Sequence, residues 1–460
     1  MTFPKNLRRL LKAKFDLITN ENLKKNLLNA VPFWAGAALC GVVSVFYAKL
    51  FAWAEMAGRH IFLQTNWLFF IITPLSFVLA WWLVARFAPY ARGSGIPQVT
   101  AAIELSNPKH AYMVNALLNL KIILLKVVSS LVMVFGGGII GREGPTIQIC
   151  ASIFKKINDL LPDWYPKISR RNMIVTGGAA GLAAAFNTPL GGIVFAIEEL
   201  TKTHFSFFKS ALLSGVIIAG LTALYFLGPY LYLGYPDLSV LPAWIILITI
   251  PISILAGLAG SGMGSIALTL LKLKKSLKNN FQHILYAALC GLAIAALAVF
   301  VDGRILGSGK EIMVDTLFTG EKHSEWYLPL LRIFGSITSF STGASGGIFA
   351  PSLSAGASIG SVFSGWFQLS DTETNLVILC GMAGFLTGIT RSPFTSSILV
   401  LEMTNSHNVI LYIMLTALFS NLIAYLVSRH SFYDHLKMDY IREIHGSEVQ
   451  QVSGVSSREK

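Results

Sequence analysis

Long apolar stretches separated by short polar loops run through almost the whole chain. They cover residues 31–56, 67–87, 114–140, 172–200, 210–234, 239–271, 281–301, 327–343, 348–368, 375–401 and 408–428. A helix needs about 20 apolar residues to cross the hydrocarbon core of a bilayer. Lys and Arg cluster in the loops between the stretches, as they do in the cytoplasmic loops of membrane proteins. The pattern therefore predicts an all-α polytopic membrane protein.

Several stretches have the wrong length for a simple transmembrane helix. Some are too long and are interrupted by Gly136-Gly137-Gly138 or by Asn187-Thr188-Pro189, and others begin directly after Gly-rich turns. Interrupted backbone is tolerated inside a membrane only where it packs against protein or lines a cavity. We therefore expect broken helices around a functional site.

Composition and charge agree with this class of protein. Of 460 residues, 54% are apolar and only 13% are charged, whereas a soluble domain carries about 25% charged residues. The net charge of +13 could indicate a nucleic-acid partner, but confinement of the basic residues to short loops argues against nucleic acid. The four cysteines have no metal-like or redox spacing, and no nucleophile–base signature occurs. We expect no metal, no cofactor and no enzyme activity.

The N-terminal end of the chain is basic. Residues 1–29 carry apolar positions at helical spacing and predict an amphipathic segment on the cytoplasmic side of the membrane. Basic residues also cluster in the loops at 155–171 and 272–278, and we place these loops and the tail, residues 431–460, in the cytoplasm as well. The first apolar stretch follows a long basic lead without an A-x-A cleavage site, which favours a retained span over a signal peptide.

The sequence aligns with itself at a spacing of about 200 residues. The recurring blocks are Gly93-Ser94-Gly95 with Gly307-Ser308-Gly309, Ala151-Ser152-Ile153 with Ala357-Ser358-Ile359, and Gly178-x-Ala180-Gly181 with Gly381-x-Ala383-Gly384. A duplicated membrane bundle with interrupted segments at matching positions is typical of a secondary transporter. We divide the membrane region into a first half, 30–206, and a second half, 207–430. The alternative is chance similarity between helices rich in Gly and Ala.

The repeat also indicates where the two halves differ. Glu198 aligns with Glu402, so both are candidates for scaffold acids that cap or pair within the halves. Glu143 and Glu199 align with apolar residues of the second half. Such unpaired carboxylates are candidates for chemistry, because an ionised carboxylate is costly in apolar surroundings.

Three Gly-rich turns, at 93–97, 141–145 and 346–351, each precede an apolar helix-like run. Gly frees the backbone, and Pro suits the first helical turn. Backbone N–H groups at converging helix N-termini can hold an anion without a full cation, and can therefore release it. The alternative is that the small residues only permit close helix packing. Residues 303–311 resemble a phosphate loop, but Glu311 stands where Ser or Thr must ligate magnesium, so we reject a nucleotide site.

The segments GSGIP (93–97), GREGP (141–145) and GGIFAP (346–351) resemble the signature motifs of the CLC family of chloride channels and proton/chloride antiporters. The stretch GLAAAFNTPLGGIVFAIEE (181–199) is similar to bacterial members without paired C-terminal nucleotide-sensing domains. The resemblance implies two inverted repeats of broken, tilted transmembrane helices. It further implies a homodimer, with one anion pathway per subunit, that exchanges protons for chloride across a bacterial inner membrane. The alternative is a passive chloride channel of the same fold.

The resemblance assigns chloride binding to Ser94, Tyr433 and the turn formed by Gly347, Ile348 and Phe349. Ser94 and Tyr433 would contribute hydroxyl groups, and the turn would contribute backbone N–H groups. Ser94 also favours chloride over nitrate, because members of the family that prefer nitrate carry proline at this position.

Proton handling is assigned to two carboxyl groups by the same resemblance. Glu143 resembles the external gating glutamate, and Glu199 resembles the internal proton glutamate. The presence of Glu199 favours an exchanger, because channels of the family commonly lack an acid there. Lys126 resembles a membrane-embedded lysine of bacterial members, and we expect it to be structural; Arg142 and Arg332 are expected to be structural or surface-facing.

Overall fold

The computed structural model describes residues 19–201, 209–228, 231–239, 241–320 and 322–456. These residues form helices and connecting turns, with two isolated β-bridges and no strand within the described ranges. Eight of the described helical segments are long and apolar enough to cross a membrane. The prediction of an all-α, multi-pass membrane protein is therefore confirmed.

The helices differ widely in length. Those up to residue 227 are α2 (Glu21–Gln64), α3 (Phe69–Phe87), α4 (Ile96–Glu104), α5 (Val114–Leu117), α6 (Leu120–Phe135), α7 (Glu143–Leu160), α8 (Arg170–Phe186), α9 (Pro189–Phe195) and α10 (Lys209–Leu227). Those that follow are α11 (Ile246–Lys275), α12 (Asn280–Phe300), α13 (Lys310–Phe318), α14 (Leu328–Ser341), α15 (Phe349–Trp366), α16 (Asp371–Thr390), α17 (Pro393–Thr404), α18 (Ile410–Val427) and α19 (Phe432–Ser456). A π-helical turn, Ala196–Thr201, continues α9.

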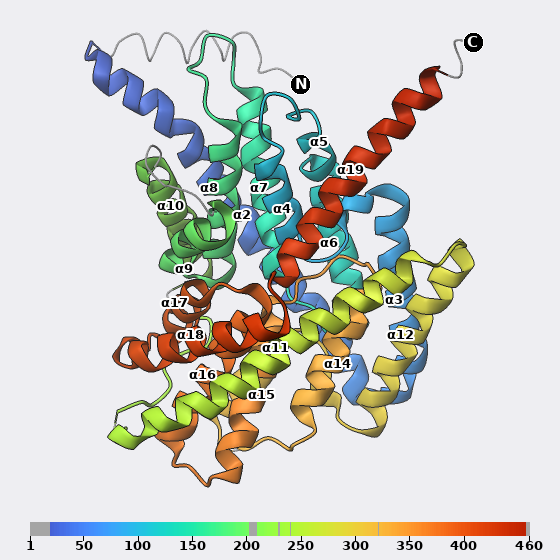
Figure 1. Ribbon diagram of the computed structural model, residues 1–460, viewed down its shortest axis with the longest axis vertical. Coiled ribbons are helices and arrows are strands. Elements are labelled where there is room, and N and C mark those ends of the chain that lie inside the picture. The colour runs from blue at the N-terminus through green and yellow to red at the C-terminus, as the bar shows by residue number, and fades with distance from the viewer. Residues whose placement is uncertain (1–18, 202–208, 229–230, 240, 321, 457–460) are drawn as a thin grey trace.

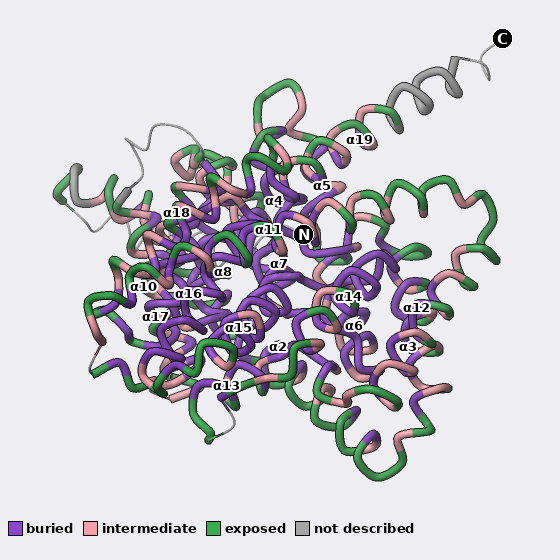
Figure 2. The backbone as a smooth tube through the Cα atoms, turned by 60° about the horizontal axis from the view of Figure 1, so that its bottom comes forward, coloured by how far each residue is buried: buried purple, intermediate pink, exposed green. Residues whose placement is uncertain are grey.

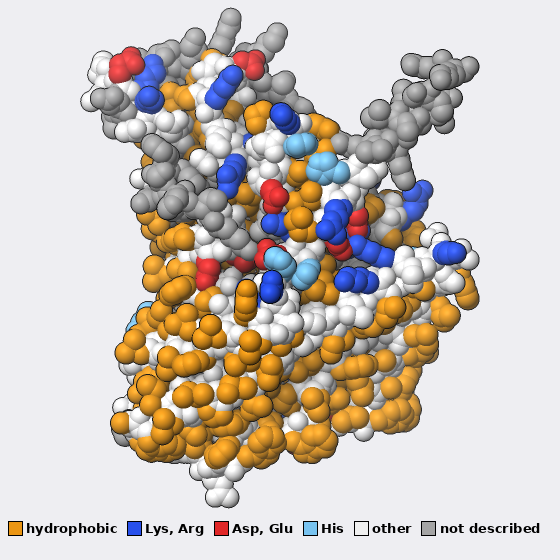
Figure 3. Space-filling view, in the orientation of Figure 1, with side chains coloured by type: hydrophobic (Ala, Val, Ile, Leu, Met, Phe, Trp, Pro, Cys, Tyr) orange, Lys and Arg blue, Asp and Glu red, His pale blue; other side chains and the backbone are white. Residues whose placement is uncertain are grey.

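The helices differ in how deeply they are buried (Figures 1 and 2). Helices α7, α8, α15 and α16 lie in the middle of the molecule, with α3, α10, α12 and α18 at its periphery. The most apolar window of α16 is 94% buried, against 33% in α12. The peripheral surface exposes large side chains such as Trp53, Tyr225 and Leu426, and Figure 3 shows hydrophobic side chains covering the lower part of one face. Such a surface is stable only when lipid covers it.

Two helix breaks occupy matching positions in the repeat. After α8, Asn187 adopts a left-handed conformation (φ +58°), and Pro189 begins α9. After α16, Arg391 is also left-handed (φ +64°), and Pro393 begins α17. Proline suits the first helical turn because its missing N–H group would have no helical partner there. The predicted break at Asn187 is confirmed, and the stretch 375–401 is divided in the same way.

Glu198 and Glu402 cap helices of the opposite half. The Glu198 carboxylate accepts hydrogen bonds from two N–H groups in the first turn of α17, at 3.2 and 2.7 Å. The Glu402 carboxylate accepts from two N–H groups in the first turn of α9, at 3.0 and 2.7 Å. A carboxylate is favourable at a helix N-terminus because the unpaired N–H groups carry partial positive charge. The expected scaffold role is confirmed, but the pairing runs between the halves and not within them.

Two buried cations anchor the two Gly-Ser-Gly turns. Lys126 of α6 donates from Nζ to the carbonyls of Ala91 and Gly93, at 3.0 and 2.8 Å. Arg332 of α14 donates to three carbonyls of residues 305–308 and to Ser354 Oγ. Both side chains are fully buried. Because these bonds fix the turns from behind, Lys126 and Arg332 are structural, as expected.

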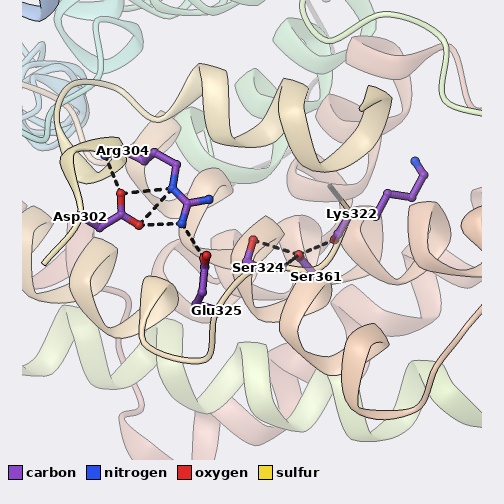
Figure 4. Close-up of polar contacts among 6 residues, drawn as sticks. All are labelled: Asp302, Arg304, Lys322, Ser324, Glu325 and Ser361. Carbon is purple, nitrogen blue, oxygen red and sulfur yellow. Dashed lines mark hydrogen bonds and ion pairs between the residues drawn. The ribbon is translucent and has the colours of Figure 1, made fainter. Parts of the chain in front are cut away.

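Polar contacts also hold the loops around the second turn (Figure 4). Arg304 bridges Asp302 and Glu325, with Nη2–oxygen distances of 2.7 and 2.5 Å. Ser361 of α15 donates from Oγ to the carbonyl of Lys322, at 2.6 Å. These contacts tie the loop after α12 to the loop before α14, and tie the latter loop to α15.

The basic loops gather at one end of the bundle. Lys275, at the end of α11, pairs with Asp439 of α19 at 2.8 Å. Arg170, at the start of α8, donates to a carbonyl of the loop after α4 at 3.0 Å, and His110 of that loop packs against His445 of α19. The first described turns of α2 lie at the same end (Figure 1). The positive charge that predicts a cytoplasmic side is therefore concentrated where α19 leaves the bundle.

The predicted end segments fall partly outside the described residues. Residues 1–18 of the amphipathic segment 1–29 lie outside them. Helix α2 begins at Glu21, so the rest of that segment runs directly into the first membrane helix. Helix α19 begins at Phe432, next to the predicted start of the tail, and is described as far as residue 456.

Candidate functional site

Backbone hydrogen bonds bring the three Gly-rich turns together. The N–H of Gly93 donates to the carbonyl of Ala344 (2.8 Å), and the N–H of Gly346 donates to the carbonyl of Gly93 (3.1 Å). Gly141 and Gly347 exchange two bonds, at 2.7 and 2.8 Å. These are the two isolated β-bridges of the fold. The predicted convergence of the three turns is therefore confirmed.

The turns approach one another so closely that they require glycine. Gly95 has a φ of +107°, and a Cβ atom there would lie 2.8 Å from the carbonyl oxygen of Gly144. A Cβ atom at Gly347 would lie 3.1 Å from the backbone nitrogen of Gly144. Helices α4, α7 and α15 begin inside these three Gly-rich segments, at Ile96, Glu143 and Phe349. Their N-termini, which carry partial positive charge, therefore lie close to one another.

Two buried hydroxyl groups face this junction. Ser94 and Tyr433 are each about 1% exposed, and the side chains lie within interaction range of each other. Neither Ser94 Oγ nor the Tyr433 hydroxyl forms a hydrogen bond within the described part of the chain. The Tyr433 ring also stacks on Phe349, with centroids 6.2 Å apart and planes 12° apart. Since an unsatisfied buried hydroxyl costs about 1–3 kcal/mol, both groups are suited to a ligand that accepts hydrogen bonds.

The N–H groups of the turn before α15 have two different roles. One forms a hydrogen bond within the protein, and two others are candidate donors to a ligand. Gly347 donates its N–H to Gly141 (2.8 Å), which corrects the expectation that Gly347 is itself an anion ligand. Ile348 and Phe349 form the cap and the first residue of α15. The first N–H groups of a helix have no partner within it. Of the three predicted residues, Ile348 and Phe349 therefore remain as candidate backbone donors.

Glu143 opens α7 and lies over the start of α15. Its side chain is 1% exposed, and its carboxyl group lies within interaction range of the Ala350 N–H. Oε1 accepts a long hydrogen bond from the Tyr232 hydroxyl, at 3.5 Å, and Oε2 has no hydrogen-bond partner among the described residues. Lys310 Nζ lies 4.7 Å from the centre of the Tyr232 ring. The carboxyl group thus occupies a position where helix N-termini favour negative charge. The preceding residue, Arg142, is half-buried.

Glu199 lies in the π-helical turn after α9, a kind of irregularity that is frequent at functional sites. The side chain is 4% exposed, and Oε2 accepts a hydrogen bond from Ser392 Oγ at 2.9 Å. Glu199 also lines a cavity of about 280 Å³ that includes Glu104 of α4 and Lys437 of α19. The Glu199 carboxyl and the Lys437 side chain of α19 therefore line the same cavity.

Tyr433 lies near both candidate carboxyl groups. Its hydroxyl is within electrostatic range of both Glu199 and Glu143. It also lies near Ser94, which belongs to the turn that Lys126 anchors. Ser94, Glu143 and Glu199 therefore all lie near the Tyr433 hydroxyl.

Two contacts of the site were not predicted from the sequence. Tyr232 lies in the loop after α10 and carries no local signal that it meets Glu143. Ser392 offered a weak signal, because it precedes Pro393 at a helix break that matches the break before Pro189.

The described part of the chain contains no candidate metal site. No group of three or more His, Cys, Asp or Glu side chains lies in a metal-binding arrangement there. The four cysteines are buried and free.

Comparisons with known proteins agree with the fold and the motifs. Residues 76–425 match the family model described as "Voltage gated chloride channel". The "H(+)/Cl(-) exchange transporter ClcA" of Cronobacter sakazakii is 29% identical over 403 residues, covering 84% of this chain and 84% of the relative.

Two solved structures have the same fold. A slow cyanobacterial Cl⁻/H⁺ antiporter superposes with a TM-score of 0.77 at 23% identity, covering 90% of this chain and 98% of the other. A CLC-type fluoride/proton antiporter superposes with a TM-score of 0.74 at 21% identity and the same coverage. Because the family model spans most of the membrane region, the chain belongs to the voltage-gated chloride channel (CLC) family.

Proposed function

We propose that this protein exchanges chloride for protons across a bacterial inner membrane. The observation that carries the proposal is the set of three buried polar groups, on Ser94, Tyr433 and Glu143, gathered at the N-terminus of α15. The Cronobacter sakazakii relative, named an H⁺/Cl⁻ exchange transporter, supports the same activity.

Chloride binds through hydrogen-bond donors and not through a full cation. Ser94 and Tyr433 supply hydroxyl groups, and Ile348 and Phe349 supply N–H groups at the start of α15. A hydrogen bond to a charged acceptor contributes about 1.5–3 kcal/mol. Lys126 is close by, but it donates to the carbonyls that shape the turn. A site built from dipoles can bind chloride and still release it quickly.

Proton coupling follows from competition between chloride and the Glu143 carboxylate. The carboxylate and an anion are attracted to the same helix N-termini, so an arriving chloride displaces the side chain. A displaced carboxylate that reaches water can take up a proton and return in neutral form. Glu199 supplies or accepts the proton on the other side, through the cavity that it lines.

The fold alone does not select the anion. Two structures of almost equal likeness are described as antiporters of different halides, chloride and fluoride. Ser94 favours chloride, because the resemblance to the family associates proline at this position with nitrate.

A passive chloride channel is the second candidate. It would use the same anion site without a proton route. Glu199 favours the exchanger, because the resemblance to the family associates an acid at this position with exchangers and its absence with channels.

We also propose a homodimer with both chain ends in the cytoplasm. The orientation is supported by the basic loops, which gather where α19 leaves the bundle. Each subunit would contain its own anion pathway.

Flux measurements test the exchanger against the channel. Purified protein in liposomes is given an outward chloride gradient while internal pH is recorded. An exchanger moves protons inward against their own gradient as chloride leaves. Chloride release without any proton movement would establish the channel and exclude the exchanger.

A further inference from the structure

A basic cavity lies near the first Gly-Ser-Gly turn, at the end of the bundle where α19 leaves. Its volume is about 360 Å³, and it lies between α3, α11, α12 and α19. The charged and titratable side chains that line it are Arg92, Lys274, Lys275, His283 and Glu443. Three cations and a histidine thus face a single carboxylate. Figure 3 shows Lys and Arg side chains gathered where α19 meets the upper end of α11.

The single carboxylate of the lining does not neutralise its cations. Glu443 pairs with Arg92 (2.5 Å) and with Lys275 (3.2 Å), and Lys275 also pairs with Asp439 outside the cavity. Lys274 forms no ion pair with any described residue; it donates to a backbone carbonyl at the end of α14. It is also close enough to Arg92 to repel it. The cavity therefore has an excess of positive charge, which an anion would reduce.

The rest of the cavity wall consists of an aromatic surface and an apolar surface. Trp81 stacks against the His283 ring, with centroids 5.5 Å apart, and Lys274 Nζ lies 5.9 Å from the centre of the Trp81 ring. His283 Nδ1 is buried without a hydrogen-bond partner among the described residues. The remaining lining is apolar and includes Val84 and Leu271.

We propose that this cavity binds the phosphate group of an anionic membrane lipid. The negative phosphate would lie against Lys274, Lys275 and Arg92, as in other basic pockets between transmembrane helices on the cytoplasmic side. The acyl chains would run along the apolar wall at Val84 and Leu271. A soluble phosphate offers the same charge, but it would leave that wall uncovered.

Binding of a lipid in the cavity would also affect the anion site. Arg92 directly precedes the turn that carries Ser94, and Glu443 belongs to the helix whose first turn carries Tyr433. A bound phosphate competes with Glu443 for Arg92 and Lys275, so it would loosen the attachment of α19. This effect on transport rests on the proposed function, whereas binding of the lipid does not.

Lipid binding is tested on the full-length protein in detergent. Short-chain phosphatidylglycerol is titrated and counted by native mass spectrometry, with phosphatidylcholine as the neutral lipid. Lys274→Gln and Lys275→Gln should each weaken phosphatidylglycerol binding about tenfold, since each removes one charge-assisted contact. Lys275 is about half exposed, so Lys275→Gln remains informative if Lys274→Gln does not fold. The matched control is Lys272→Gln, which removes the same charge from an exposed position on the same helix.

The outcomes separate the alternatives. Equal binding by Lys275→Gln, Lys272→Gln and the unmodified protein would overturn the proposal. Displacement of phosphatidylglycerol by an equal concentration of inorganic phosphate would overturn the assignment to a lipid. Because binding is counted without any ion gradient, absence of proton-coupled transport would contradict the proposed function and leave the lipid site standing.

Discussion

The two Gly-Ser-Gly turns of the molecule share a sequence and a kind of anchor, but they differ in what faces them. The turn at 93–95 is anchored by Lys126, and the Ser94 hydroxyl has no hydrogen-bond partner among the described residues. The turn at 307–309 is anchored by Arg332, and the Ser308 N–H donates to Glu55 Oε1 at 2.5 Å. A carboxylate of α2 thus satisfies the second turn.

This difference distinguishes a structural turn from the turn at which we propose anion binding. A helix N-terminus favours any anion, whether free or attached to the chain. Glu55 is attached through α2 and cannot leave, so it stabilises the fold permanently. At the first turn, we propose that a free anion binds to Ser94 and is released. Whether a Gly-Ser-Gly turn is occupied by an attached carboxylate or is open to a free anion therefore depends on a residue that is distant in sequence.

Removal of the anchors should produce the largest change. Arg332→Met removes five hydrogen bonds and should lower the free energy of unfolding by about 4 kcal/mol or more. Lys126→Met removes two bonds and should lower it by about 2–3 kcal/mol. Both values can be measured by denaturant titration in detergent. Chloride affinity should fall only in folded Lys126→Met, and an equal loss in folded Arg332→Met would remove the distinction between the turns.

Substitution of the two serines compares the turns directly. Ser94→Ala should weaken chloride binding by about 1.5–3 kcal/mol, because a hydroxyl donor to a charged acceptor is lost. Ser308→Ala should leave chloride affinity unchanged, because the bond to Glu55 comes from the Ser308 backbone. Isothermal titration with chloride measures both affinities. If both variants bind chloride as tightly as the unmodified protein, Ser94 is not part of the anion site.

Neutralisation of Glu55 should have the smallest effect. Glu55→Gln keeps an oxygen acceptor for the Ser308 N–H but removes its charge, so the free energy of unfolding should fall by about 1 kcal/mol. Chloride affinity should not change. A new chloride site in Glu55→Gln, detected as a second binding event, would mean that the second turn is also able to transport.

The local features of the fold could be predicted from the sequence because they depend on local chemistry. Asn187 and Pro189 encode a helix break within three residues, and the Gly-rich turns encode the starts of α4, α7 and α15. The repeat then indicated which turns correspond. Family resemblance added the candidate roles of Ser94 and Tyr433, whose side chains the fold brings together.

The long-range partners could not be predicted in the same way. Glu55 reaches Ser308 across about 250 residues of sequence, and nothing near either residue indicates the contact. The exchange of caps by Glu198 and Glu402 depends on how the halves pack, so the expectation of pairing within each half was wrong. Gly347 has the composition of an anion-binding turn, but its N–H is used by Gly141.

The division of labour between Glu143 and Glu199 is tested most directly by recording chloride and proton fluxes together. Liposomes with an outward chloride gradient would contain Glu143→Ala, Glu199→Gln or the control Glu198→Gln, which alters a helix cap outside the proton route. We expect chloride to move in all three and protons to move against their gradient only in Glu198→Gln. Uphill proton movement by Glu199→Gln or Glu143→Ala would contradict the proposed exchange mechanism.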